Sequence, residues 1–229
     1  MIRGLLRKDW RLLRTYLLML LVLNAASYAI VYFLMPTIEF EQGHTVRWVL
    51  TFGTGSLSAV VLSTPAIVML AGGAFTIERM DRSAEFLTCL PPTRRHVLAS
   101  KVIVVYGSVA AVVAVNAAVS YTAEQLTHHF DIQSETLNFD LFLRCAKIIV
   151  GITGAAWACS SVARSNGAPV ALGLISPAIV ASLLLTINYI FERSTDGEAF
   201  PMRFEDANLA TGIAGFAIGC FCFLNRAEG

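Results

Sequence analysis

A stretch of thirty residues, from Trp48 to Ile77, contains no charged side chain. The hydrocarbon core of a bilayer is about 30 Å thick, so a helix needs about 20 apolar residues to cross it. A helix can do so because all of its backbone polar groups are paired within the segment. Five other apolar windows are long enough, or nearly long enough, to cross a bilayer. The six windows are Tyr16–Met35, Trp48–Ile77, Val102–Ala123, Ile148–Ala163, Ser165–Phe191 and Leu209–Asn225.

The composition agrees with a membrane protein. Hydrophobic residues make up 56% of the chain and charged residues 14%, against about 45–50% and 25% in soluble domains. The 229 residues hold six spans and their loops, with no room for a second folded domain. The five cysteines are an odd number and most fall inside spans, which argues against a disulfide framework. We therefore predict an all-α membrane protein whose six transmembrane helices form one domain over residues 16–229.

The distribution of cations predicts the orientation. Six crossings place both termini on one side of the membrane, and twelve of the 17 Lys and Arg residues belong to that side. The positive-inside rule therefore predicts cytoplasmic termini and a multi-pass protein of the cytoplasmic membrane. Most acidic residues lie in the opposite loops.

Two of the spans have irregular features. Pro65, Gly72 and Gly73 predict a kink in the long second window. The fourth span is predicted to start near Leu141, with Arg144 and Lys147 extending toward the headgroups.

Residues 1–15 form an amphipathic pattern. At about 100° per residue, the five basic side chains up to Arg14 lie opposite an arc that includes Leu5, Leu13 and Trp10. This segregation predicts a separate interfacial helix that lies in the headgroup plane and contacts anionic lipid.

One acidic residue interrupts the apolar arc. Asp9 lies in its middle, where a lone carboxylate would be costly to bury. We expect it to pair with a cation of the bundle or of the next cytoplasmic loop, with Arg79 and Arg82 as candidates. The alternative is that the helix frays and Asp9 reaches water.

The predicted cytoplasmic loop from Glu78 to Lys101 contains a further short amphipathic helix, at about residues 80–90. Apolar residues recur at helical spacing up to Leu90, and Pro91 and Pro92 end the helix. Thr93 is placed to cap the third span. The alternative is an ordinary connector whose apolar side chains rest on lipid.

This loop resembles that of the permease subunits of type-two ATP-binding-cassette exporters. These subunits commonly carry an acid–base pair after span two, a short helix ending in Leu-x-x-Pro, then a hydroxyl residue, arginines and a lysine. Asp9 is similar to an acid in their N-terminal helix. The matching loop residues are Glu78, Arg79, Glu85, Phe86, Leu87, Leu90, Pro91, Thr93, Arg94, Arg95 and Lys101.

The resemblance implies a function for the loop. Its helix would be the coupling helix, which sits in a groove of a cytoplasmic ATPase and transmits the closure of that ATPase. The residues assigned to this contact are Glu78, Arg79, Arg82, Glu85, Phe86, Leu87, Leu90, Arg94 and Arg95. One departure is the outer segment Glu192–Asn208, which is short for the pair of re-entrant helices often found there.

The resemblance also implies partners. A second permease copy or a paralogue would complete a homodimer or heterodimer. Such dimers form chiefly through spans one and five, which makes Asn24 and Asn188 candidates for the pathway or the dimer seam. ATP and magnesium would bind the partner ATPase, with no cofactor in this chain. Membrane lipid is an expected partner, and nucleic acid is not.

The sequence lacks the motifs of other energy sources and of enzymes. It has no G-x-x-x-x-G-K-[ST] loop for ATP and no titratable residue in the central turns of a span. All four histidines lie in loops, so Ser56 has no base within the membrane, and no metal site is expected. We predict a non-enzymatic permease of an ATP-driven exporter for an apolar or amphipathic substrate. The alternatives are a scaffold or assembly factor without transport, and an integral membrane enzyme.

Overall fold

The computed structural model describes residues 2–34, 43–80, 93–129, 139–163, 165, 167–194 and 201–225. Within these ranges the regular structure is α-helical, and six units are long and apolar enough to cross a membrane. This confirms the predicted fold class and the six candidate spans. The helices are α1 (Ile2–Leu34), α2 (Gly43–Leu62), α3 (Thr64–Met80), α5 (Arg94–His129), α6 (Phe139–Val162), α7 (Gly167–Ser194) and α8 (Phe204–Asn225).

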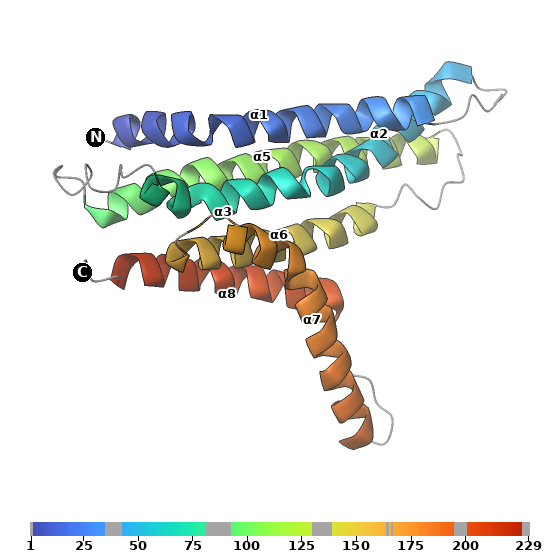
Figure 1. Cartoon of the computed structure of the whole chain (residues 1–229). Helices are drawn as coiled ribbons and strands as arrows, with labels where there is room; N and C mark the ends of the chain where they lie inside the picture. Colours follow the sequence, from blue (N-terminus) through green and yellow to red (C-terminus); the bar gives the residue numbers. More distant parts are fainter. Residues whose placement is uncertain are drawn as a thin grey trace.

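Most of the helices lie side by side in one bundle, with both ends of the chain at the same end of it (Figure 1). The core is formed mainly by α3 and α6. Ile67, Leu70 and Phe75 of α3 and Trp157 of α6 are at most 2% exposed. The ring of Phe75 lies edge-on to that of Trp157 at 4.7 Å. The other helices surround this pair and expose apolar side chains, as expected for a surface that meets lipid.

The N-terminal segment is not a separate interfacial helix, which corrects the prediction for residues 1–15. Helix α1 runs without a break from Ile2 to Leu34. Leu5, Asp9, Leu13 and Leu20 are buried and form one stripe that continues into the span. Part of the apolar arc therefore packs against protein, while Trp10 remains 54% exposed. Amphipathicity alone does not distinguish packing against protein from contact with headgroups.

The second span breaks into two helices close to the predicted kink. Helix α2 ends at Leu62 and α3 starts at Thr64, with a turn at Ser63. Pro65 lacks the backbone N–H that would continue the hydrogen bonding of α2. The chain is held at this point because Ser63 N–H donates to Ala59 O at 3.0 Å and Ile67 N–H donates to Ser63 O at 3.0 Å.

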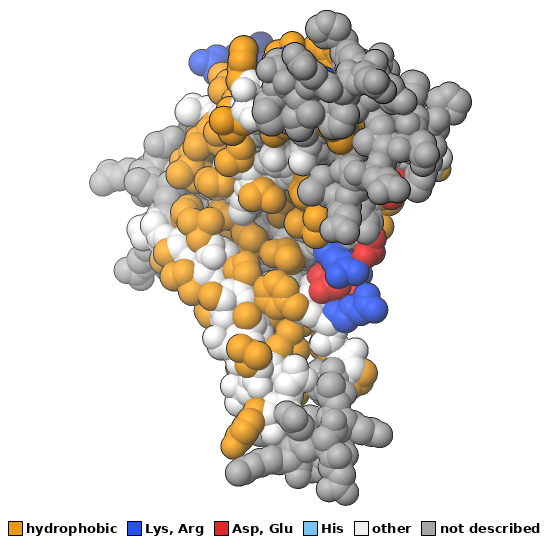
Figure 2. Space-filling view, turned by 90° about the vertical axis from the view of Figure 1, so that its right-hand side faces the viewer, with side chains coloured by type: hydrophobic (Ala, Val, Ile, Leu, Met, Phe, Trp, Pro, Cys, Tyr) orange, Lys and Arg blue, Asp and Glu red, His pale blue; other side chains and the backbone are white. Residues whose placement is uncertain are grey.

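Helix α7 follows the bundle at first and then turns away from it (Figure 1). Pro177 lies inside this helix and cannot donate a hydrogen bond to Gly173 O. Ser176 Oγ donates to that carbonyl instead, at 2.8 Å. Hydrophobic side chains extend along the projecting part (Figure 2), where Leu185 is 70% exposed.

Helices α6 and α8 approach each other more closely than any side chain would permit. A Cβ atom at Gly151 would lie 2.6 Å from Asn208 O, and one at Gly215 would lie 2.5 Å from Gly154 O. A Cβ at Gly154 would collide with the backbone of Gly212. The glycines of the last span therefore support packing within one chain, because small residues allow such an approach.

We predict that Gly154→Leu destabilises the protein by about 1–3 kcal/mol, the usual cost of overpacking. The side chain would force α6 away from the Gly212 backbone. The thermal midpoint of the detergent-solubilised protein, followed by size-exclusion chromatography, measures this effect. Gly107→Leu on α5 is the matched control, because a Cβ there meets no atom within 4 Å. Equal midpoints for the two variants would contradict the prediction.

Candidate functional site

Three helices bring charged side chains together near the bundle end that carries both termini. Asp9 comes from α1, Glu78 from the last turn of α3 and Lys101 from α5. Their exposed fractions are 3%, 6% and 1%. Lys101 Nζ lies 2.9 Å from Glu78 Oε2 and 3.6 Å from Asp9 Oδ1. One ammonium group therefore links two carboxylates from different helices.

Lys8 and Ser100 complete this arrangement, which we call the buried charge cluster (Lys8, Asp9, Glu78, Ser100 and Lys101). Lys8 Nζ lies 2.5 Å from Glu78 Oε1 and is partly exposed. Ser100 Oγ donates a hydrogen bond to Asp9 Oδ2. Two acids thus face two bases, and the formal charges balance.

Lys101 is also held by α3. Its Nζ donates to Ala74 O at 2.5 Å and lies 5.5 Å from the centre of the Phe75 ring, a distance at which a cation interacts favourably with a ring. Lys101 comes just before the uncharged window that starts at Val102. The buried charge cluster therefore lies at the edge of the apolar region and not in its centre.

Asp9 pairs with a cation of the bundle, as expected: it contacts Lys101 and, in addition, Ser100. The side chains of Arg79 and Arg82, the candidates named from the sequence, lie outside the described residues. The alternative, in which Asp9 reaches water, does not describe this structure because the residue is 3% exposed. Lys8 was missed because the helical wheel assigns it to the polar arc. The useful signal was the single acid in the apolar arc, which indicated a buried partner without identifying it.

The other residues predicted to contact an ATPase lie around the cluster or outside the described residues. The carboxylate of Glu78 is buried against two lysines, so it positions helices. Arg94 Nη1 donates to Leu224 O in the last turn of α8 at 3.5 Å, and Arg95 is exposed. The side chain of Arg79 is not described. The loop residues Arg82, Glu85, Phe86, Leu87 and Leu90 also lie outside the described residues.

The start of α5 explains how Lys101 is placed. The helix begins at Arg94, directly after Thr93, and Thr93 O accepts hydrogen bonds from the N–H groups of His96 at 2.9 Å and Val97 at 3.4 Å. The Thr93 hydroxyl lies 2.7 Å from His96 Nδ1. These contacts define the first turn of α5, and Lys101 follows two turns later on the face toward α1 and α3.

The asparagines of the spans have different surroundings. Asn116 of α5 accepts a hydrogen bond from Tyr28 Oη of α1 at 2.6 Å and donates to Val112 O at 2.8 Å, so it links two helices. Asn24 Nδ2 is buried without a hydrogen-bond partner among the described residues. Asn188 lies on the projecting part of α7, and α1 does not contact α7 in this chain. The structure therefore does not bring Asn24 and Asn188 together.

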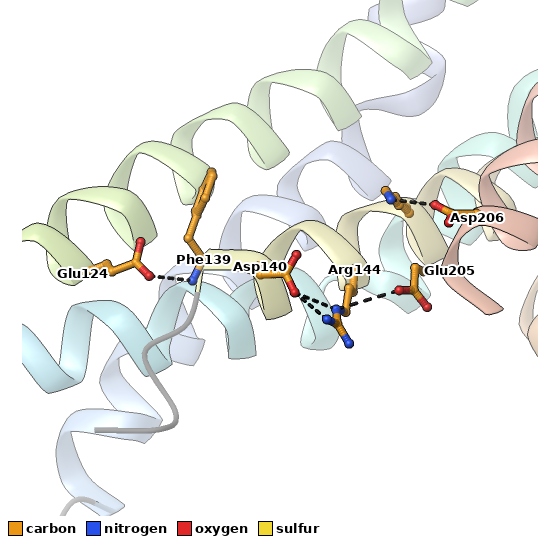
Figure 3. A network of polar contacts seen from close by, with 7 residues as sticks. Glu124, Phe139, Asp140, Arg144, Glu205 and Asp206 are labelled. Carbon is orange, nitrogen blue, oxygen red and sulfur yellow. Dashed lines mark hydrogen bonds and ion pairs between the residues drawn. The ribbon is translucent and has the colours of Figure 1, made fainter. Parts of the chain in front are cut away.

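A second polar cluster joins α5, α6 and α8 at the opposite end of the bundle (Figure 3). Arg144 Nη2 lies 2.5 Å from Asp140 Oδ2, and its Nε lies 3.8 Å from Glu205 Oε1. Lys147 Nζ lies 2.6 Å from Asp206 Oδ1. The two cations of α6 thus pair with acids in the first turns of α6 and α8, and both side chains stay partly exposed. Within the described residues, no group of His, Cys, Asp and Glu could hold a metal ion.

Comparison with known families decides the class of the protein. The profile of the ABC-2 family transporter proteins matches residues 10–192, which is more than half of the chain. The chain belongs to the ABC-2 family of transporter membrane proteins. Comparisons with curated proteins and with solved structures found no match.

Membership in the ABC-2 family confirms the predicted resemblance and makes the chain a multi-pass membrane permease. Permease domains of this family typically lack ATPase activity and imply a partner ATPase subunit. The match begins at Trp10, directly after Asp9, and covers most of α1 and all of α3 and α5. Glu78, Ser100 and Lys101 of the buried charge cluster therefore lie within the matched region, and Lys8 and Asp9 lie just before it.

We predict that Lys101→Met alone destabilises the ABC-2 permease by about 3–5 kcal/mol, because it leaves an uncompensated charge in a buried site. Asp9→Asn should have a similar but smaller effect. In the double variant D9N/K101M, Glu78 keeps its pair with Lys8, and much of the loss should be recovered. Thermal midpoints of the four proteins form a double-mutant cycle. Strictly additive losses would show that Asp9 and Lys101 do not interact.

Proposed function

We propose that this ABC-2 permease is the membrane subunit of an ATP-driven exporter, with its termini and the buried charge cluster on the cytoplasmic side. Cytoplasmic ATPase subunits would dock on the segment between α3 and α5, and ATP with magnesium would bind there and not in this chain. The cation count along the sequence supports this orientation. The family supports the partner ATPase.

The buried charge cluster carries the proposal. Glu78 lies just before the segment 81–92 and Lys101 lies soon after it, and both are tied to α1 through Lys8 and Asp9. A force applied to that segment therefore acts on both of its ends and on α1 together. Separating these charges without solvating them would cost several kcal/mol per ion. The three helices should consequently move as a unit when the ATPase closes.

The cargo is proposed to be apolar or amphipathic. Within the described spans, the charged side chains lie toward the helix ends, and the polar groups farther inside are amides and hydroxyls such as Asn116. Spans with this distribution of polar groups offer no counter-charge for a small ion within the membrane.

We predict that the charge swap R82E/E85R weakens the contact with the ATPase. Arg82 and Glu85 belong to the proposed coupling helix, and reversing both charges should make the surface mismatched. The tagged permease, purified in mild detergent from its native membrane, should carry a Walker-motif ATPase whose activity the permease raises. The swap should reduce both the amount of ATPase bound and its stimulation.

The swap D140R/R144D is the matched control, since it exchanges an acid and a base at the opposite end of the bundle. It should leave ATPase binding unchanged. If R82E/E85R binds and stimulates the ATPase as the wild type does, the assignment of the coupling helix is wrong. If the wild type carries no ATPase, the proposed function itself fails.

A second copy of the chain, or a paralogue, is proposed to pack on α7. Beyond Pro177 this helix leaves its own bundle (Figure 1). Leu183 and Leu185 are exposed on that part of the helix. Helix α1, which carries Asn24, makes no contact with α7 in the same chain. A two-fold seam in which α7 of each copy packs against α1 and α7 of the other would cover both surfaces.

We predict that Leu185→Cys, in a chain whose own cysteines are replaced by serine, forms a covalent dimer in native membranes treated with a bifunctional thiol reagent. The reason is that two copies of α7 would meet near the symmetry axis of the dimer. The dimer band on a denaturing gel measures the effect. Val115→Cys on α5, which is 61% exposed, is the control and should stay monomeric. Equal cross-linking at the two positions would argue against this seam.

A further inference from the structure

An apolar groove lies between α2 and α5 at the end of the bundle away from the termini. Its volume is about 590 Å³, within the range of about 300–1,000 Å³ of ligand pockets. Trp48, Val49 and Phe52 line it from α2, and residues from Ala118 to Leu126 line it from α5. We call it the α2–α5 groove. Helix α7 contacts neither α2 nor α5, so it does not cover the groove in the same chain.

A stack of aromatic rings forms one wall of the groove. The rings of Tyr32 and Trp48 are stacked with centres 5.0 Å apart, and those of Trp48 and Phe52 with centres 5.7 Å apart. Trp48 is still 47% exposed. Tryptophan is typical of the level at which the hydrocarbon meets the headgroups. The wall therefore offers a flat apolar surface that begins near the headgroups.

Arg47 adds a cation beside this wall. Its guanidinium carbon lies 4.2 Å from the centre of the Tyr32 ring, and Nη2 donates to Tyr32 O at 3.0 Å. Its Nε is buried without a hydrogen-bond partner in the described part of the chain. No carboxylate among the described residues pairs with Arg47. A guanidinium has five N–H donors, and most of those of Arg47 are left for another acceptor.

We propose that the α2–α5 groove binds an anionic phospholipid of the membrane. One acyl chain would lie along Trp48 and Phe52, and the phosphate would accept hydrogen bonds from Arg47. Apolar lining selects an alkyl chain. The guanidinium, which has no carboxylate partner among the described residues, selects a negative headgroup, since arginine binds phosphate in a bidentate manner. This site goes beyond the proposed function and does not depend on it.

Quenching of Trp48 fluorescence by brominated lipid tests the site. The full chain is reconstituted in phosphatidylcholine vesicles that contain a minor fraction of brominated phosphatidylglycerol or, separately, of brominated phosphatidylcholine. The signal of Trp48 is the difference between the wild type and Trp48→Phe. We expect the anionic lipid to bind about fivefold more strongly, the factor that about 1 kcal/mol per cation gives. No cargo is present, so the preference reports on membrane lipid alone.

Three variants make the test specific. Arg47→Gln should abolish the preference, and Arg47→Lys should keep part of it. Ala118→Phe should fill the groove and reduce quenching by the anionic lipid to the level of phosphatidylcholine. Ala111→Phe, an exposed position on α5 outside the groove, should leave the preference intact.

The proposal is overturned if both brominated lipids quench Trp48 equally in the wild type, which would indicate a general lipid shell only. It is also overturned if Arg47→Gln or Ala118→Phe keeps the wild-type preference. Should Arg47→Gln fail to fold, the contrast between Ala118→Phe and Ala111→Phe decides the question.

Discussion

The ammonium group of Lys101 lies where α1, α3 and α5 meet, and the arrangement of these helices depends on how its charge is neutralised. A buried cation is stable only when acids and hydrogen-bond acceptors surround it. Asp9 and Glu78 supply the acids, and Ala74 O supplies the acceptor. These groups come from three different helices. If one helix moved away from the other two, a charge would be left without its partner in apolar surroundings. The cluster therefore specifies the mutual position of the helices as well as contributing to stability.

The requirement that buried charges and polar groups be paired also explains which parts of the fold could be predicted from the sequence. The six spans follow from length and the absence of charge, since an uncharged helix of about 20 residues has few alternatives. The break near Pro65 and the bend at Pro177 follow local backbone rules, although only the break near Pro65 was expected. What covers the apolar face of a helix, protein or lipid, could not be predicted in the same way. Amphipathicity showed that residues 1–15 have an apolar side, but not that protein covers part of it.

Asp9 shows the limit most clearly. Its position in the apolar arc indicated a buried cation, and the family motif contained Lys101 without connecting the two residues. The connection depends on α1 and α5 lying together, which no local pattern encodes. The α6–α8 contact is similar: it depends on Gly151 and Gly154 of α6 lying opposite Asn208 and the glycines of α8, a pairing that emerges only from the bundle.

The two ends of the bundle hold their charges differently, and this difference bears on the mechanism. At the end away from the termini Arg144 is paired but nearly half exposed, so water already solvates its charge. Surface pairs of this kind contribute little to stability, because water screens them. At the other end Lys101 is 1% exposed, and separation would strand its charge. A force applied near the buried cluster should therefore shift three helices together. At the end away from the termini the charged pairs add little to the contact between α6 and α8, which the close approach of their glycines already holds. The asymmetry suits a permease that is driven from the end carrying the buried charge cluster.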